Sequence, residues 1–207
     1  MFSGNGVLET PMGVYEGDFE NNMRSGKGIM KYTDGSTYDG LWKDDKFHGK
    51  GTHTTSVGTY VGDFVKGQRE GEGTFTFGNI FYDGSWKEGK FNGFGLFRST
   101  NSYETQFEGE WEQGKKYKGI QSFADGSKWD GSFTNGKMSG VGKMTYPNGL
   151  VIEGKWKNGI RDGKMVTATR DNVKIAVEKG REESSNAEYL PPESFPFVDT
   201  QQWMSGL

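Results

Sequence analysis

Large aromatic residues and glycines recur along the chain at a fixed period, with polar residues between them. The clearest copy begins at Tyr82 and reads YDGSWKEGKFNGFG, which fits the pattern Y-x-G-x-[FW]-x-x-G-x-x-x-G-x-G. Copies of varying quality begin at residues 15, 38, 60, 82, 107, 129 and 152, which stand 23, 22, 22, 25, 22 and 23 residues apart. A repeated motif of this length is typical of proteins built from stacked structural units.

Each unit contains two stretches in which large or small residues alternate with polar ones. Tyr82, Gly84 and Trp86 share one face of an extended strand, because successive side chains point to opposite sides. The second stretch of a unit, such as residues 71–77 (GEGTFTF), repeats this alternation. A period of two in both stretches predicts two strands per unit.

Turn residues separate the predicted strands. The eighth residue of every unit tolerates the positive φ of a tight hairpin turn: Asn22, Asp45, Gly67, Gly89, Gly114, Gly136 and Gly159. The connections between units hold turn pairs such as Asp34-Gly35 and Asn148-Gly149. The predicted fold class is therefore all-β: an elongated, twisted, single-layer antiparallel sheet of tandem β-hairpins, with roughly 14 to 16 strands over about 70 Å.

The regular glycines need a physical reason, because glycine inside a strand normally costs stability. They share a face with the large rings and leave flat backbone on which a Tyr or Trp ring can lie. We therefore expect a ladder of rings along one face of the sheet. The unit from Phe107 lacks one residue and one glycine near Lys115–Gly119, which we expect to bend or slip the ladder locally.

The composition divides the chain into three parts. Residues 1–165 form the repeat array, a half repeat followed by about seven units, and residues 166–178 are expected to form a closing hairpin. Residues 179–207 are an acidic linker and a tail that holds three of the five prolines. The segment from Glu178 to Leu207 has six acids and two bases, a charge of −4, which leaves residues 1–177 at +1.

The tail is apolar in places and is not a repeat. We expect Phe195, Phe197 and Trp203 either to dock on the ring face near Trp129, Phe133 and Trp156, in the same chain or in a second copy, or to act as a free linear motif. Its prolines disfavour a regular helix or a central strand.

Several classes of function are disfavoured by composition. The nearly neutral array has no general attraction for nucleic acid or an anionic membrane. The 207 residues contain no cysteine, which excludes a disulfide framework and a thiolate site. No apolar run reaches membrane-spanning length and the N-terminus has no leader-like stretch, so we expect a cytoplasmic protein.

Candidate chemistry is sparse. His48 and His53 fall at positions of opposite parity in one unit, which opposes a shared metal site or a catalytic role. Gly-x-Gly lies inside a predicted strand and does not open a helix, so it is not a phosphate loop. We expect no enzyme activity, no metal and no cofactor. Lys115, Lys116 and Lys118 form the best basic cluster and are a weak candidate for contacting lipid headgroups.

The Tyr-x-Gly-x-Trp…Gly-x-Gly units resemble MORN repeats (membrane occupation and recognition nexus) over about residues 2–165. The resemblance implies an elongated, twisted, single-layer β array. Members of this family resemble scaffolds of cytoskeletal, ciliary or junctional assemblies, and some hold a partner helix in the groove. Others carry the repeats ahead of a catalytic domain, but the roughly 40 residues after this array are too few for one.

The resulting hypothesis is a non-catalytic protein–protein scaffold, associated with the cytoskeleton or a cilium, that binds a helix, an extended segment or a second copy in a ring-lined groove. Tyr and Trp dominate the contact energies of many interfaces. The expected contact residues are Tyr38, Trp42, Tyr60, Phe64, Tyr82, Trp86, Trp111, Trp129, Phe133 and Trp156. Two alternatives stay open: a peripheral adaptor for membranes or phosphoinositides, and a repeat module for carbohydrate or choline-type ligands.

Overall fold

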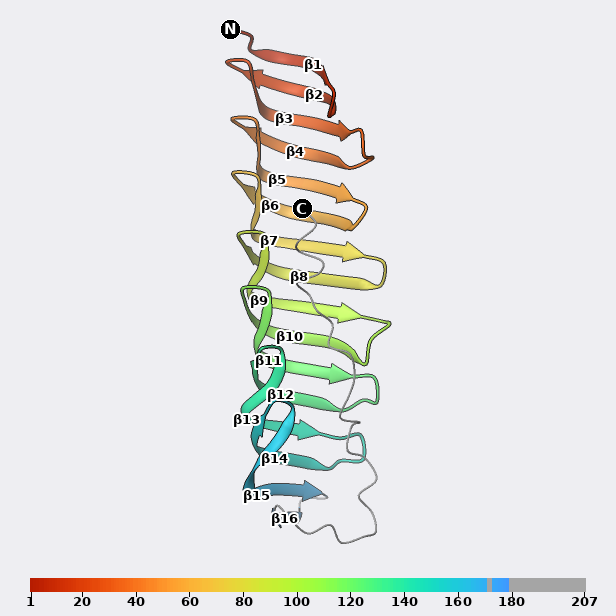
Figure 1. The fold of residues 1–207 in the computed structure, drawn as a ribbon, viewed down its shortest axis with the longest axis vertical. Coiled ribbons are helices and arrows are strands. Elements are labelled where there is room, and N and C mark those ends of the chain that lie inside the picture. The colour runs from red at the N-terminus through yellow and green to blue at the C-terminus, as the bar shows by residue number, and fades with distance from the viewer. Residues whose placement is uncertain (171–172, 179–207) are drawn as a thin grey trace.

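A computed structural model describes residues 1–170 and 173–178 and places them in one open sheet of 16 strands (Figure 1). The strands lie in chain order and each is antiparallel to the next, so the all-β, single-layer prediction is confirmed. The strands are β1 Gly4–Thr10, β2 Gly13–Glu20, β3 Met23–Tyr32, β4 Thr37–Lys43, β5 Lys46–Thr55, β6 Gly58–Val65, β7 Gln68–Phe77, β8 Ile80–Lys87, β9 Lys90–Ser99, β10 Glu104–Glu112, β11 Lys115–Phe123, β12 Lys128–Thr134, β13 Lys137–Thr145, β14 Val151–Lys157, β15 Ile160–Arg170 and β16 Val173–Glu178.

Each sequence unit is one hairpin, from β2–β3 through β14–β15. The hairpin turns use positive φ at both central residues, as at Asn21 (53°) and Asn22 (67°). Turns of this kind match the right-handed twist of the strands that they join. β1 is the second strand of a half unit and forms one edge of the sheet. β16 pairs with β15 from Met165↔Glu178 to Arg170↔Val173.

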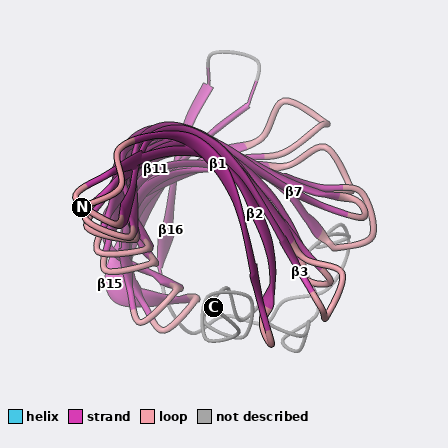
Figure 2. Ribbon diagram, turned by 90° about the horizontal axis from the view of Figure 1, so that it is seen from above, coloured by secondary structure: helices cyan, strands magenta, loops and turns pink. Residues whose placement is uncertain are grey.

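A β-bulge interrupts the pairing of every hairpin, directly after the paired glycines in most units. In the unit from Tyr60, Gly62 pairs with Gly73 but the next residue, Asp63, pairs with Glu70. Gly71, inside this bulge, has a φ of 67°, which favours glycine. Bulges bend a strand and increase its twist. The strands consequently arch together around a trough that is open on one side, as Figure 2 shows from above.

The rings lie on glycine pairs, as predicted. Beneath Tyr60 the glycines Gly62 and Gly73 pair directly across two strands. A Cβ added to Gly73 would lie 2.4 Å from the Tyr60 hydroxyl oxygen, so the ring leaves no room for a side chain there. Each ring then meets the next unit edge to face, as Tyr60 meets Trp86 with centroids 4.9 Å apart. The rings on one face of the single-layer sheet thereby pack against one another and form its hydrophobic core.

The short unit from Phe107 slips without breaking the sheet. Its bulge leaves one residue, Tyr117, opposite no partner, because Glu110 pairs with Lys118 and Trp111 with Lys116. The regular bulges leave two residues unpaired, as in the unit from Tyr60. Pairing with β12 continues from Lys118 onward, so the missing residue is absorbed inside one hairpin.

Candidate functional site

The ten rings expected to form the contact surface are instead the core of the sheet. Their residues are between 0% and 7% exposed: Tyr38, Trp42, Tyr60, Phe64, Tyr82, Trp86, Trp111, Trp129, Phe133 and Trp156. The open apolar surface that the sequence interpretation assigned to them is not found, because each ring is covered by the rings of neighbouring units. Their role in binding a partner stays a prediction.

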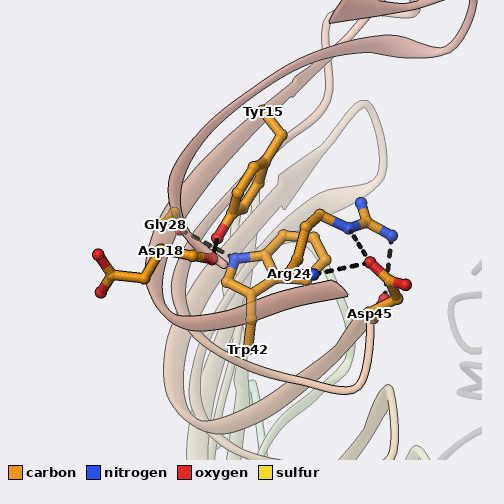
Figure 3. Close-up of polar contacts among 6 residues, drawn as sticks. All are labelled: Tyr15, Asp18, Arg24, Gly28, Trp42 and Asp45. Carbon is orange, nitrogen blue, oxygen red and sulfur yellow. Dashed lines mark hydrogen bonds and ion pairs between the residues drawn. The ribbon is translucent and has the colours of Figure 1, made fainter. Parts of the chain in front are cut away.

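Hydrogen bonds to the backbone fix these rings in place. The Tyr15 hydroxyl donates to the Asp18 carbonyl at 2.9 Å, and the Trp42 indole Nε1 donates to the Gly28 carbonyl at 3.0 Å (Figure 3). Burial, followed by the nearby Asp18 carboxylate, raises the pKa of Tyr15 to about 12. The neutral hydroxyl therefore persists as a donor. Both interactions recur along the array, with Tyr38, Tyr60 and Tyr82 as hydroxyl donors and Trp86 and Trp111 as indole donors.

The tenth residue of each unit carries a feature that the sequence reasoning missed. Cations and apolar residues alternate there, and the half unit supplies the first member: Phe2, Arg24, Phe47, Arg69, Phe91, Lys116, Met138 and Arg161. The signal is visible in the sequence, but it repeats every two units and is lost when each unit is compared with a one-unit pattern.

Two apolar members of this series, Phe47 and Phe91, stack on the leading tyrosine of their unit. Phe47 lies parallel to Tyr38 with centroids 3.7 Å apart and an interplanar angle of 7°. Phe91 lies on Tyr82 in the same way, at 3.7 Å and 11°. These two phenyl rings cover Tyr38 and Tyr82, which are both 0% exposed.

Three cations of the series lie over rings, where the electron-rich ring face attracts them. The Arg24 guanidinium carbon is 4.3 Å from the centroid of Trp42. Figure 3 shows that its Nε also meets the carboxylate of Asp45, at 3.0 Å, in the neighbouring hairpin turn. The Lys116 ammonium lies over Phe107 and pairs with Glu104.

Arg69 differs from the other two cations over rings because it has no acidic partner. Its guanidinium lies between Tyr60, Phe75 and Trp86, with its central carbon 5.1, 5.2 and 5.1 Å from their centroids. The residue is 5% exposed, and its side chain forms no ion pair or hydrogen bond within residues 1–170 and 173–178. Burial lowers the pKa of Arg69 to about 10, which leaves it charged at neutral pH.

The three lysines considered for lipid contact do not form one patch. Lys115 and Lys118 are exposed, whereas Lys116 is buried on the ring face, 8% exposed. Lys116 also donates to the side-chain carbonyl of Gln121. Burial lowers the pKa of Lys116, and the Glu104 carboxylate opposes that shift. Lys116 therefore belongs to the core and not to an exposed basic surface, while lipid contact by Lys115 and Lys118 stays a prediction.

The two histidines lie on one strand, β5, but have different surroundings. His53 lies beside the rings of Phe47 and Tyr38, at 5.2 and 6.3 Å between centroids. Burial, followed by repulsion from Arg69, lowers the pKa of His53 to about 4. His48 is half-buried earlier on the same strand. In the described part of the chain no group of three or more His, Cys, Asp or Glu side chains is placed to hold a metal ion.

The candidate tail residues Phe195, Phe197 and Trp203 lie outside the described residues. Within the described ones, no helix is long and apolar enough to cross a membrane.

The arched single-layer sheet, the bulged hairpins and the internal ring core define a curved β-repeat module. A comparison with protein families agrees: the MORN repeat model matches residues 15–37, 38–59, 60–79, 82–102, 107–128, 129–151 and 153–164. These matches cover most of the chain, which therefore belongs to the MORN-repeat family, as the sequence resemblance predicted. The family is a non-catalytic repeat module, consistent with a repeat-based role in binding. No curated protein matches the chain at a level that would indicate a close relative.

Proposed function

We propose that the protein is a non-catalytic scaffold that binds a segment of another protein, helical or extended, along the concave face of its sheet. The observation that carries the proposal is a row of half-buried apolar side chains packed on the ring core, together with a buried cation, Arg69, that has no acidic partner within the described residues. A partner segment would bury these apolar side chains, which the rings of the array cover only in part.

The surface available to a partner consists of side chains that pack on the core without being enclosed. They are Phe19, Tyr32, Phe47, Phe77, Ile80, Phe123, Met138 and Leu150. They are distributed from β2 to the turn before β14, along the length of the sheet, rather than gathered in one spot. A distribution of this kind favours an elongated partner over a small molecule, whose pockets are compact and enclosed.

The identity of the partner is a proposal that rests on the family resemblance. We place it in a cytoskeletal or ciliary assembly in the cytoplasm, and a second copy of this chain is the other protein partner that the trough would accept. Membrane binding is not favoured by a specific observation, since Lys116 is turned into the core.

Two variants on one strand test whether the concave face binds. M138E places a charge on the trough side of β13, where Met138 packs against the core. V141E places the same charge on a residue of β13 that is 70% exposed and outside the core, and it is the matched control. Affinity capture from the source cell with the wild type should recover a partner that M138E loses, by tenfold or more, and V141E retains.

The result is interpretable only if both variants keep the fold, which circular dichroism and thermal unfolding establish. Equal capture by the two variants, or loss with V141E alone, would place the binding surface elsewhere and refute the proposal.

A further inference from the structure

Arg69 is the one cation over the rings, among those described, whose charge is not balanced by a neighbour. Arg24 and Lys116 are each held by a carboxylate, from Asp45 and Glu104. Asp45 stands at the eighth position of the unit that follows Arg24. The corresponding residue of the unit that follows Arg69 is Gly89, which has no side chain to offer.

The contacts of Arg69 leave its charge available to an outside group. The guanidinium makes ring contacts but no hydrogen bond, although it carries five N–H donors. Buried charges are normally paired, since water cannot replace the missing partner. The only side-chain nitrogens that are fully sealed without a partner in the described part are those of Trp129 and Trp156, so the Arg69 donors still reach the surface of the trough.

We propose that this cation receives a carboxylate from the chain's own C-terminal segment, and that the pairing lays residues 189–203 along the trough. The segment 182–207 has five acids and neither Lys nor Arg, so it complements an unpaired cation. It also supplies Phe195, Phe197 and Trp203, apolar rings that match the half-buried side chains of the trough.

The distance along the sheet selects Asp199 as the partner. Nine strand spacings separate β16 from β7, about 43 Å at about 4.8 Å each. Counted from Glu178 at about 3.3 Å per residue, an extended chain reaches about 33 Å at Glu188, about 50 Å at Glu193 and about 69 Å at Asp199. Glu188 is too near the sheet's end, and Glu193 arrives only when almost fully extended. Asp199 arrives with length to spare.

A segment anchored in this way would cover the surface assigned to the partner under the proposed function. It would cross the units that contain Trp129, Phe133 and Trp156 on its way from β16 to Arg69. The segment then acts as an internal competitor that a partner must displace. The inference concerns the chain alone, so it is testable without the partner.

Hydrogen exchange on the full chain tests the pairing. In the wild type, amides of residues 195–203 should exchange about tenfold or more slowly than in a synthetic peptide of residues 186–207. R69M and D199N should each remove most of this protection, and the double variant R69M/D199N should exchange no faster than either one. E188Q and R24M are matched controls, an acid out of reach and a cation already paired, and should leave the rates unchanged.

Peptide-like exchange of residues 195–203 in the wild type would overturn the proposal, and so would protection that survives both R69M and D199N. Unfolding by R69M is recognised from faster exchange of the amides of β7 and β8. In that case D199N, which changes no residue of the strands β1 to β16, decides alone. Failure here leaves the capture experiment with M138E and V141E unaffected, so the two proposals fail separately.

Discussion

The units from Tyr60 and Tyr82 and the units from Phe107 and Trp129 are neighbours in one sheet, but they stabilise their rings differently. In the first pair, the Tyr60 and Tyr82 hydroxyls donate to backbone carbonyls at 2.9 Å, and the Trp86 indole donates to Gly73 at 2.9 Å. In the second pair, Phe107 has no hydroxyl to donate. The Nε1 atoms of Trp129 and of Trp156, in the unit that follows, are buried without a hydrogen-bond partner among the described residues.

The unsatisfied indole of Trp156 lies beside a unit whose leading ring is enlarged. Trp129 stands where the regular units have tyrosine, and it lies over Gly142: a Cβ there would be 2.2 Å from the tip of the indole. By analogy with Trp86 and Gly73, the carbonyl of Gly142 is the acceptor that Trp156 would use. The Trp156 donor is nevertheless unpaired, and the larger ring over the glycine is the difference between the two units.

The comparison shows that the features that pair the strands differ from the hydrogen bonds that hold the rings in place. Gly131 pairs with Gly142 and the bulge follows directly, as in the regular unit where Gly62 pairs with Gly73. Glycine pairs, bulges and turns are therefore sufficient for the pairing of strands. The ring-to-backbone hydrogen bonds add stability and vary from unit to unit.

The largest expected effect compares two tryptophans. W86A should destabilise the fold by about 3–5 kcal/mol, because it removes a ring that is 3% exposed and leaves a cavity. W156A should cost about 1 kcal/mol less, because its indole makes no hydrogen bond among the described residues. Urea unfolding of both variants measures the difference. Equal losses would show that the indole hydrogen bond contributes nothing.

A second test concerns the polar core of the unit from Phe107. E104Q removes the charge that balances buried Lys116 and should cost about 2 kcal/mol, less than for a fully buried pair because the Glu104 side chain is 24% exposed. Adding K116M should recover most of the loss, since Met138 already occupies that position in the next unit. Denaturant unfolding of the single and double variants checks this, and additive losses would contradict it.

A third variant should stabilise the protein. W129Y brings a hydroxyl to the position from which Tyr60 and Tyr82 bond the backbone, and it uncovers Gly142 for Trp156. Each restored hydrogen bond is worth about 1 kcal/mol, partly offset by the smaller ring, so we expect a net gain of about 1 kcal/mol. The thermal unfolding midpoint should rise. A fall would mean that the indole's packing outweighs its unsatisfied donor.

The sequence was sufficient for the fold because its signals are local. The period, the turn residues and the glycines beside each Tyr act within one hairpin, and they predict the strands and their alternation. The exposure of the rings was predicted wrongly, because a ring such as Tyr38 is covered by Phe47 of its own unit and by Trp42 and Phe64 beside it. That coverage depends on three-dimensional packing.

The pairing of the buried cations is likewise not predictable from local sequence signals. Their alternation can be read from the sequence at a period of two units. Which cation is paired depends on the turn geometry that brings Asp45 to Arg24 and on the packing that brings Glu104 to Lys116. Neither arrangement follows from spacing alone, so the sequence by itself does not distinguish buried Lys116 from exposed Lys115 and Lys118.

The smallest expected effect is a pH dependence of stability that comes from His53, the sixteenth residue of its unit. Phe75 occupies that position in a regular unit and His53 in the unit before it, where burial lowers the histidine pKa from 6.5 to about 4. The unfolded chain therefore takes up a proton at a pH where the folded chain does not. Stability associated with His53 is complete above about pH 6.5 and is lost as the pH falls toward 4.

The variant H53M, which introduces the residue that Met30 and Met144 supply at the same position, should abolish this loss. Between pH 7 and 5 we expect the wild type to lose about 1 kcal/mol more than H53M, after allowance for the solvent-screened part of the imidazole. Denaturant unfolding at the two pH values measures the difference. H48M, on the same strand, is the matched control: if it removes the acid loss as fully as H53M does, the buried ladder position is not the cause.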